Sequence, residues 1–262
     1  MTQTDKTTLK RILVALDESP PGLAALEVAT HLASQLHADL QALFVEDDNL
    51  LKLAGLPFSH EIDFTSAVAR PLDRSAVEQI FRTKANQIRE AIATTAHRAS
   101  VRWSFQVTRG RVTAEALAAA REMDAVVMGR ESSPLKSFAD ATARGDRNTI
   151  VVVYDGSPGG RRVLEIAQQF AAIRSDPIFV FVNTSEPEQA GRLRQEAIDS
   201  IDQQVQHATV SGELLSDAHE LSVAVEQTHA RLVVLNRDNL LLDERTVECL
   251  VNELDCPIAL VR

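Results

Sequence analysis

The chain contains one stretch twice, and this repeat limits what it can fold into. Residues 12–20 read Ile-Leu-Val-Ala-Leu-Asp-Glu-Ser-Pro, and residues 150–158 read Ile-Val-Val-Val-Tyr-Asp-Gly-Ser-Pro. Leu26 further on matches Leu164 at the same offset of 138 residues. A short apolar run, a turn and an amphipathic helix form the opening of a βαβ unit. The repeat therefore predicts a duplicated α/β fold.

The apolar segments predict two doubly wound parallel-sheet domains, residues 1–147 and 148–262. Such domains typically hold about 100–150 residues each. Aromatic residues make up only 4% of the chain, so Val, Ile, Leu and Ala must build cores of the kind that parallel sheets need. The second copy has five predicted strands and the first has four, because residues 150–154 already open the second copy. The first domain therefore ends without its fifth strand or borrows one.

The predicted strands and helices alternate along both copies. The strands are expected at residues 9–16, 39–45, 101–108, 125–128, 150–154, 177–182, 208–214, 231–235 and 257–261. The helices are expected at residues 21–36, 76–98, 113–123, 160–173, 187–207, 216–229 and 242–254. The strand at 101–108 alternates polar and apolar residues, which is typical of an edge strand.

Residues 46–75 form an insert that the second copy lacks. The offset between the copies falls from 138 to 107 across this segment. Its leucines, isoleucine and phenylalanines are too frequent for a flexible linker. One interpretation is a flap that packs over the carboxyl end of its own sheet. The other is a lid or a partner-binding surface.

Charge and motifs exclude several function classes. A net charge of −10 makes nucleic acid and anionic membrane surfaces poor partners. Residues 1–10 are polar and unlike a signal peptide, and no apolar run is long enough to span a bilayer, so we expect a cytoplasmic protein. The seven histidines are scattered, so no metal site is predicted. Cys249 and Cys256 are interpreted as packed thiols, with a redox role for Cys256 as the alternative. Nucleophile-elbow and Walker motifs are absent, so no catalytic residue is predicted.

These repeated openings resemble the universal stress protein family. The Phe-Val pair at 44–45, Val-Val-Met-Gly at 126–129 and the closing Cys-Pro-Ile-Ala-Leu-Val-Arg at 256–262 resemble it too. The resemblance covers nearly the whole chain as two tandem copies, outside the insert. It implies strand order 3-2-1-4-5 in each domain, and domains related by a pseudo-twofold axis as in a family homodimer.

One branch of that family binds ATP outside the carboxyl ends of the strands. In the first copy the resemblance implies a degenerate nucleotide site at Asp17, Val45, Met128, Gly129 and Ser132. Ser132 stands where a second phosphate-loop glycine is expected, and the distal Gly-Ser is absent. The structural interpretation of Asp17 is a helix N-cap or a turn acid.

The second copy departs further from the ATP-binding pattern. It has Asn236 and Asp238 at the phosphate loop and no glycine from residue 233 onward, so we expect no ATP there. Residues 156–160 form a glycine-rich loop at a helix start, which either binds an anion or is a tight turn.

The sequence favours a non-catalytic stress-response regulatory or adaptor protein of the universal stress protein type, with no cofactor. The alternatives are ATP binding in the first domain and a small-ligand sensor that uses the insert as a lid. The protein partners are not identified. The strand at 257–261 is expected to close the second domain near the junction, where it could pair with its counterpart in a second chain to form a homodimer. Residues 130–147 would cover the free edge of strand 125–128.

Overall fold

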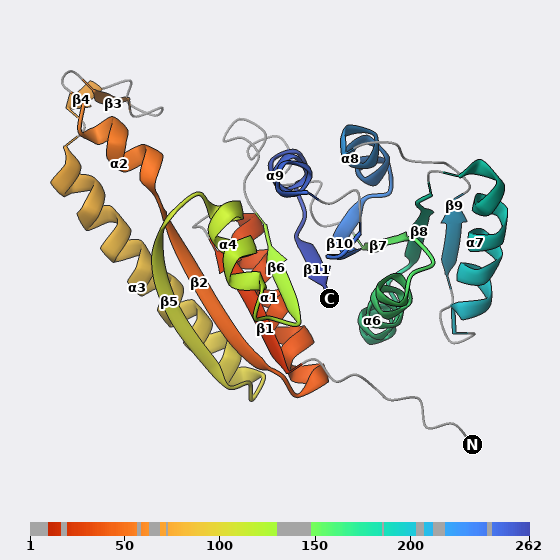
Figure 1. The fold of residues 1–262 in the computed structure, drawn as a ribbon. Helices are drawn as coiled ribbons and strands as arrows, with labels where there is room; N and C mark the ends of the chain where they lie inside the picture. The colour runs from red at the N-terminus through yellow and green to blue at the C-terminus, as the bar shows by residue number, and fades with distance from the viewer. Residues whose placement is uncertain are drawn as a thin grey trace.

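The computed structural model describes residues 10–16, 20–56, 59–62, 69–71, 73–129, 148–184, 186–202, 207–211, 218–239 and 243–262. One large sheet runs through the described chain, with helices on both sides (Figure 1). Its nine strands follow the order β5-β2-β1-β6-β11-β10-β7-β8-β9. A separate two-stranded hairpin, β3-β4, belongs to the insert.

The first repeat runs from β1 to β6 and the second from β7 to β11. The elements of the first are β1 Arg11–Leu16, α1 Pro20–Leu36, β2 Asp39–Asp47, α2 Asp48–Ala54, β3 His60–Ile62, β4 Ala69–Pro71, α3 Arg74–Arg98, β5 Trp103–Gly110, α4 Val112–Ala120 and β6 Ala125–Met128. Those of the second are β7 Thr149–Tyr154, α6 Pro158–Arg174, β8 Ile178–Val182, α7 Pro187–Ser200, β9 Ala208–Ser211, α8 Ala218–Gln227, β10 Ala230–Asn236, α9 Glu244–Glu253 and β11 Ile258–Val261.

The strand order confirms the duplicated, mostly parallel α/β fold. Each repeat places its third, second, first and fourth strands side by side, as β5-β2-β1-β6 and as β9-β8-β7-β10. Neighbouring strands within a repeat run parallel. β5 lies at one edge of the sheet, as its alternating pattern predicted. The predicted boundary between residues 147 and 148 adjoins a stretch outside the described residues, and it stays a prediction.

A single strand, β11, completes both repeats. It pairs in parallel with β10, which makes it the fifth strand of the second repeat. On its other edge it pairs antiparallel with β6, with Ile258 opposite Met128 and Val261 opposite Ala125. The first repeat therefore borrows its missing strand from the second.

This pairing corrects two expectations. The prediction that β11 pairs with its counterpart in a second chain is wrong, because both of its edges already carry hydrogen-bonded neighbours. The edge of β6 is covered by β11, and residues 130–147, which were expected to cover it, lie outside the described residues. A four-residue strand suffices because β6 is equally short.

The two faces of the sheet carry two apolar cores, and each core extends across both repeats. Residues of α1, α3, α6 and α7 pack on one face, and residues of α4, α8 and α9 pack on the other. Along β11, Ala259 and Val261 belong to the first core, while Ile258 and Leu260 belong to the second. Alternation along a strand thus places this one segment in both cores.

The described part of the insert packs beside the sheet. Leu51 and Ala54 of α2 form a small apolar cluster with Val77 and Phe81 of α3. Figure 1 shows α2 and the β3-β4 hairpin beyond the end of β2, on the α3 side. As the flap interpretation expected, these residues pack on their own repeat, but their apolar contacts are with α3, which extends past the sheet, rather than with the carboxyl end of the first repeat's sheet. Phe58 and Phe64 lie outside the described residues.

We expect Leu260→Ala to destabilise both repeats. Leu260 is 1% exposed, and removing a buried leucine side chain costs about 2–5 kcal/mol. The only tryptophan, Trp103, reports on the first repeat through β5, and the only tyrosine, Tyr154, reports on the second through β7. In urea titrations both signals should shift to lower denaturant together. Val223→Ala, at an exposed position of α8, is the control. A shift of the Tyr154 signal alone would show that the first repeat does not depend on β11.

Candidate functional site

The predicted nucleotide site of the first repeat lies at the carboxyl ends of β2, β1 and β6. Val45 and Met128 are 3% and 0% exposed, and both pack in the core on the α4 face of the sheet. Gly129 follows β6 and is also buried. Asp17 and Ser132 lie outside the described residues. The structure thus brings Val45, Met128 and Gly129 to one end of the sheet, two of them as core side chains.

An ion pair that the sequence did not predict lies beside Val45. Glu46 follows Val45 in β2, is 8% exposed, and accepts a hydrogen bond of 2.6 Å from Nε of Arg109 in β5. Hydrogen bonding to Glu46 raises the pKa of Arg109 above its usual value. A buried acid needs such a partner. The only sequence signal is a polar residue at the end of an apolar strand.

In the second repeat the same end of the sheet is closed by hydrogen bonds, beginning at Asp155. Asp155 follows β7, and its Oδ1 accepts from the backbone N of Ser157 at 3.0 Å and from the Ser157 hydroxyl at 2.6 Å. Ser157 is the N-cap of α6, and its Oγ accepts from the backbone N of Gly160 at 2.9 Å. Asp155 is therefore a turn acid, held by the chain that starts α6.

Asn236, the last residue of β10, and Asn239, in the loop that follows, complete this cluster. Oδ2 of Asp155 accepts from Nδ2 of Asn236 at 3.3 Å and from Nδ2 of Asn239 at 3.1 Å. Nδ2 of Asn183, which follows β8, donates to Oδ1 of Asn239 at 3.4 Å. The three asparagines are 4% to 9% exposed. Polar side chains from the ends of three strands thus bond to one another, which satisfies groups that burial would otherwise penalise.

The glycines of the loop make room for these side chains. A Cβ on Gly159 would lie 2.5 Å from Oδ1 of Asn236, and one on Gly160 would lie 2.3 Å from Oδ1 of Asp155. The neighbouring arginines are also engaged, since Arg161 pairs with Glu196 and Arg162 donates to the backbone O of Arg262. Side chains of the protein itself thus occupy the space beside the loop at residues 156–160, as expected of a tight turn.

The loop after β10 also ties the two repeats together. Nη1 of Arg237 donates to the backbone oxygens of Ala120 and Met123, at 2.5 and 3.3 Å, at the carboxyl end of α4. A cation is favourable there because the last carbonyls of a helix lack partners within the helix. An ion pair between Arg111 and Glu248 also links the α4 and α9 segments. The loop after β10, which aligns with the phosphate loop of ATP-binding relatives, therefore connects the two repeats.

The described part of the chain contains no candidate metal site, and its two cysteines are packed or hydrogen-bonded. No group of three or more His, Cys, Asp or Glu residues there could hold a metal ion. Cys256 is 5% exposed in the core, and Sγ of Cys249 donates to Oε1 of Glu253 at 3.1 Å. Within the same described residues, no helix is long and apolar enough to cross a membrane.

Comparison with known proteins agrees with this fold. A solved universal stress protein from Archaeoglobus fulgidus DSM 4304 is similar over 96% of each chain, with 12% identity and a TM-score of 0.54. A putative universal stress protein from Pseudomonas aeruginosa UCBPP-PA14 is 15% identical over 97% of this chain and 93% of its own, with a TM-score of 0.46. A dAMP complex of an Archaeoglobus fulgidus universal stress protein covers 44% of this chain and 96% of its own, at 16% identity and a TM-score of 0.36.

The comparisons based on sequence cover less of the chain than those based on structure. No curated protein matches the chain at a significant level. The profile of the Universal stress protein family matches residues 8–141, just over half of the chain. The matched segment holds the first repeat, and the second repeat has the same strand order in the same sheet. The chain belongs to the universal stress protein family.

Proposed function

We propose that this universal stress protein is a non-catalytic regulatory or adaptor protein of the stress response, and that its second repeat does not bind ATP. The observation that carries the proposal is the cluster of Asp155, Asn236 and Asn239 at the carboxyl end of the second repeat. These side chains occupy the place where α/β sheets of this kind usually bind ligands.

A nucleotide would have to displace interactions that hold the second repeat together. Its phosphates would meet the side chain of Asn236, where ATP-binding relatives are expected to have a glycine. Opening the cluster would leave buried polar groups without partners, at a cost of about 1–3 kcal/mol for each group. Asp238, which is exposed beside the loop, adds electrostatic repulsion.

The first repeat supports the alternative that one ATP binds there. Gly129 keeps a backbone without a side chain at the end of β6, at the position that Asn236 fills in the second repeat. The third reading, a ligand sensor with the insert as its lid, has less support, since α2 packs on α3 rather than over the end of β6.

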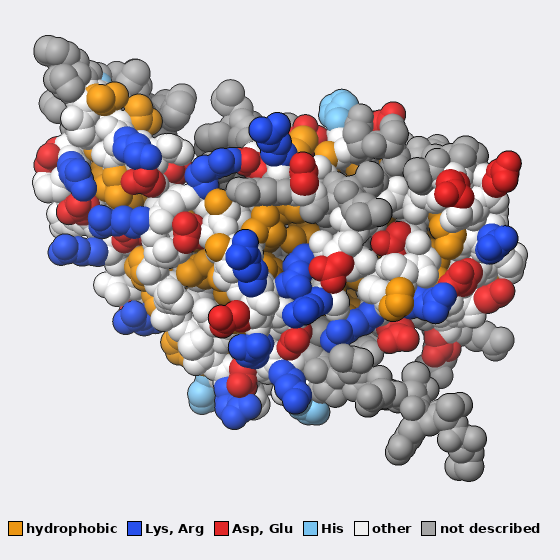
Figure 2. Space-filling view, viewed as in Figure 1, with side chains coloured by type: hydrophobic (Ala, Val, Ile, Leu, Met, Phe, Trp, Pro, Cys, Tyr) orange, Lys and Arg blue, Asp and Glu red, His pale blue; other side chains and the backbone are white. Residues whose placement is uncertain are grey.

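An adaptor role is supported by apolar side chains on the insert. On α2 and just after it, Leu50, Leu53 and Leu56 are 36%, 52% and 56% exposed, and Ile80 of α3 is 39% exposed. Figure 2 shows hydrophobic side chains among charged ones in this region of the surface. Exposed apolar groups of this kind favour protein–protein contact. A homodimer would also need a surface other than β11.

Equilibrium dialysis with radiolabelled ATP tests the proposal. We expect each chain to bind no more than one ATP, and to bind none if the first repeat does not bind ATP either. Gly129→Asn copies the residue of the second repeat into the first, so it should remove whatever binding exists. Asn86→Gln, at an exposed position of α3, is the control and should change nothing. Two ATP per chain, or binding that survives Gly129→Asn, would contradict the assignment.

A second test asks whether the asparagine cluster is structural. Asn236→Ala should lower the free energy of unfolding by about 1–3 kcal/mol, because Asp155 and Ser157 each lose a donor. Asn86→Ala should change it by less than about 0.5 kcal/mol, as surface substitutions usually do. Urea unfolding followed through Tyr154 measures both. Equal effects would mean that the cluster adds nothing to stability.

A further inference from the structure

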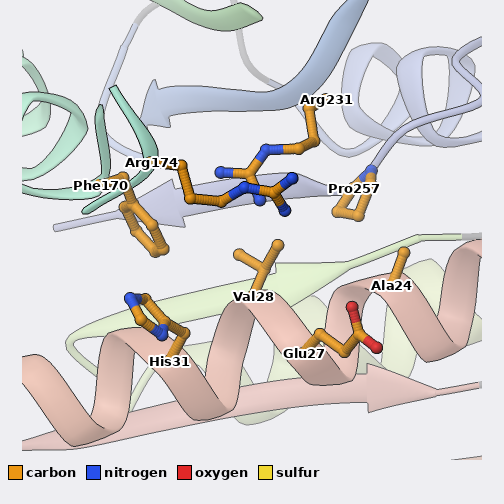
Figure 3. A pocket seen from close by; sticks show the side chains of 8 residues that line it. All are labelled: Ala24, Glu27, Val28, His31, Phe170, Arg174, Arg231 and Pro257. Carbon is orange, nitrogen blue, oxygen red and sulfur yellow. The ribbon is translucent and has the colours of Figure 1, made fainter. Parts of the chain in front are cut away.

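A pocket of about 250 Å³ lies on the α1 and α6 face of the molecule, where the two repeats meet. Helix α1 forms one wall, and α6, the start of β10 and the residue before β11 form the other (Figure 3). None of the residues discussed above for nucleotide binding lines it. The lining of the pocket therefore comes from both repeats, with Pro257 directly before β11.

Two arginines from the second repeat extend into this pocket. Arg231, at the start of β10, pairs with the nearly buried Asp176, but its Nε is buried and has no hydrogen-bond partner among the described residues. Arg174, at the end of α6, forms no ion pair within that same part of the chain. Figure 3 shows both side chains reaching into the space above α1. Asp176 thus neutralises one guanidinium group, and the other is left for an anion.

His31 of α1 adds a third unsatisfied group. Its Nε2 is buried and lacks a hydrogen-bond partner in the described structure, and its ring centroid lies 6.2 Å from that of Phe170. Burial, and then the charge of Arg231, lower the pKa of His31, which favours the neutral ring. A neutral imidazole carries one N–H, which can donate to an anion without adding charge. Unpartnered buried nitrogens are uncommon in proteins and call for an explanation.

The remaining lining limits the size and charge of an occupant. Val28, Phe170 and Pro257 give the pocket apolar walls. Its volume lies just below the roughly 300–1,000 Å³ of sites for drug-sized ligands, which suits a small occupant. Glu27, toward the Pro257 side in Figure 3, places a carboxylate away from His31. A second negative charge on the occupant would meet that carboxylate.

We propose that this pocket binds a small organic anion with a single negative charge. Its carboxylate lies between the guanidinium groups of Arg174 and Arg231, and its apolar body lies between Val28 and Phe170. Glu27 discriminates against dianions. The proposal is independent of ATP binding and of the insert. It gives the protein a ligand whose binding requires the two repeats to be joined.

Calorimetric titration with two ligands that share a benzene ring tests the proposed anion site. Benzoate carries one carboxylate, and terephthalate carries a second one at the opposite end. We expect benzoate to bind the full-length protein with a Kd of about 1 mM or tighter. Terephthalate should bind at least about tenfold more weakly, and Glu27→Gln should remove most of that difference.

The variants separate this pocket from non-specific binding. Arg174→Gln should weaken benzoate about tenfold, because a charge-assisted hydrogen bond is lost. Arg192→Gln, on the exposed surface of α7, is the matched control and should bind like the parent protein. Thermal unfolding of each variant verifies that it is folded. Absence of benzoate binding, or equal losses in the two arginine variants, would overturn the proposal. Binding of inorganic phosphate without benzoate would overturn it as well.

Discussion

The unpaired edge of β6 is the constraint on which the rest of the structure depends. A buried strand edge carries backbone N–H and C=O groups that must find partners. The first repeat lacks a strand to supply them, and β11 does so while it also completes β10. Both cores then become continuous across the junction, because alternate side chains of β11 point into each. One four-residue strand thereby turns two copies of a fold into one sheet.

That junction also governs what the carboxyl end of the second repeat can do. The loop after β10 sends Arg237 to the end of α4 and places Asn236 and Asn239 on Asp155. This loop bonds to a neighbouring helix, and its side chains occupy the space where phosphates would lie. Its backbone is therefore poorly placed to bind phosphates. The side chains at this position thus contribute to the stability of both repeats. The proposed anion pocket lies on the α1 and α6 face and makes no use of this loop.

The sequence predicted the elements well because apolar periodicity and the repeat reinforce each other. It predicted the missing fifth strand by counting, and it left open whether one was borrowed. It could not show that β11 reaches β6, because pairing between distant segments leaves no local pattern. It predicted that the insert packs on its own repeat but not that α3 is the surface, since the contact of Leu51 with Phe81 depends on how far α3 extends beyond the sheet. The roles of Asn183 and Arg237 were missed for the same reason, as their partners lie 56 and 117 residues away.

The distance between β6 and β11 along the chain has a consequence for synthesis. Met128 and its partner Ile258 are 130 residues apart. At a translation rate of about 5–20 residues per second, the ribosome needs roughly 6–26 seconds to cover that interval. Throughout it, the nascent first repeat carries an apolar strand edge whose partner, β11, has not yet been made. Nascent chains on neighbouring ribosomes present the same edge, so the opportunity for mispairing grows with the density of ribosomes on the message. A chaperone that shields β6 during this interval would raise the yield of folded protein without contacting the finished molecule.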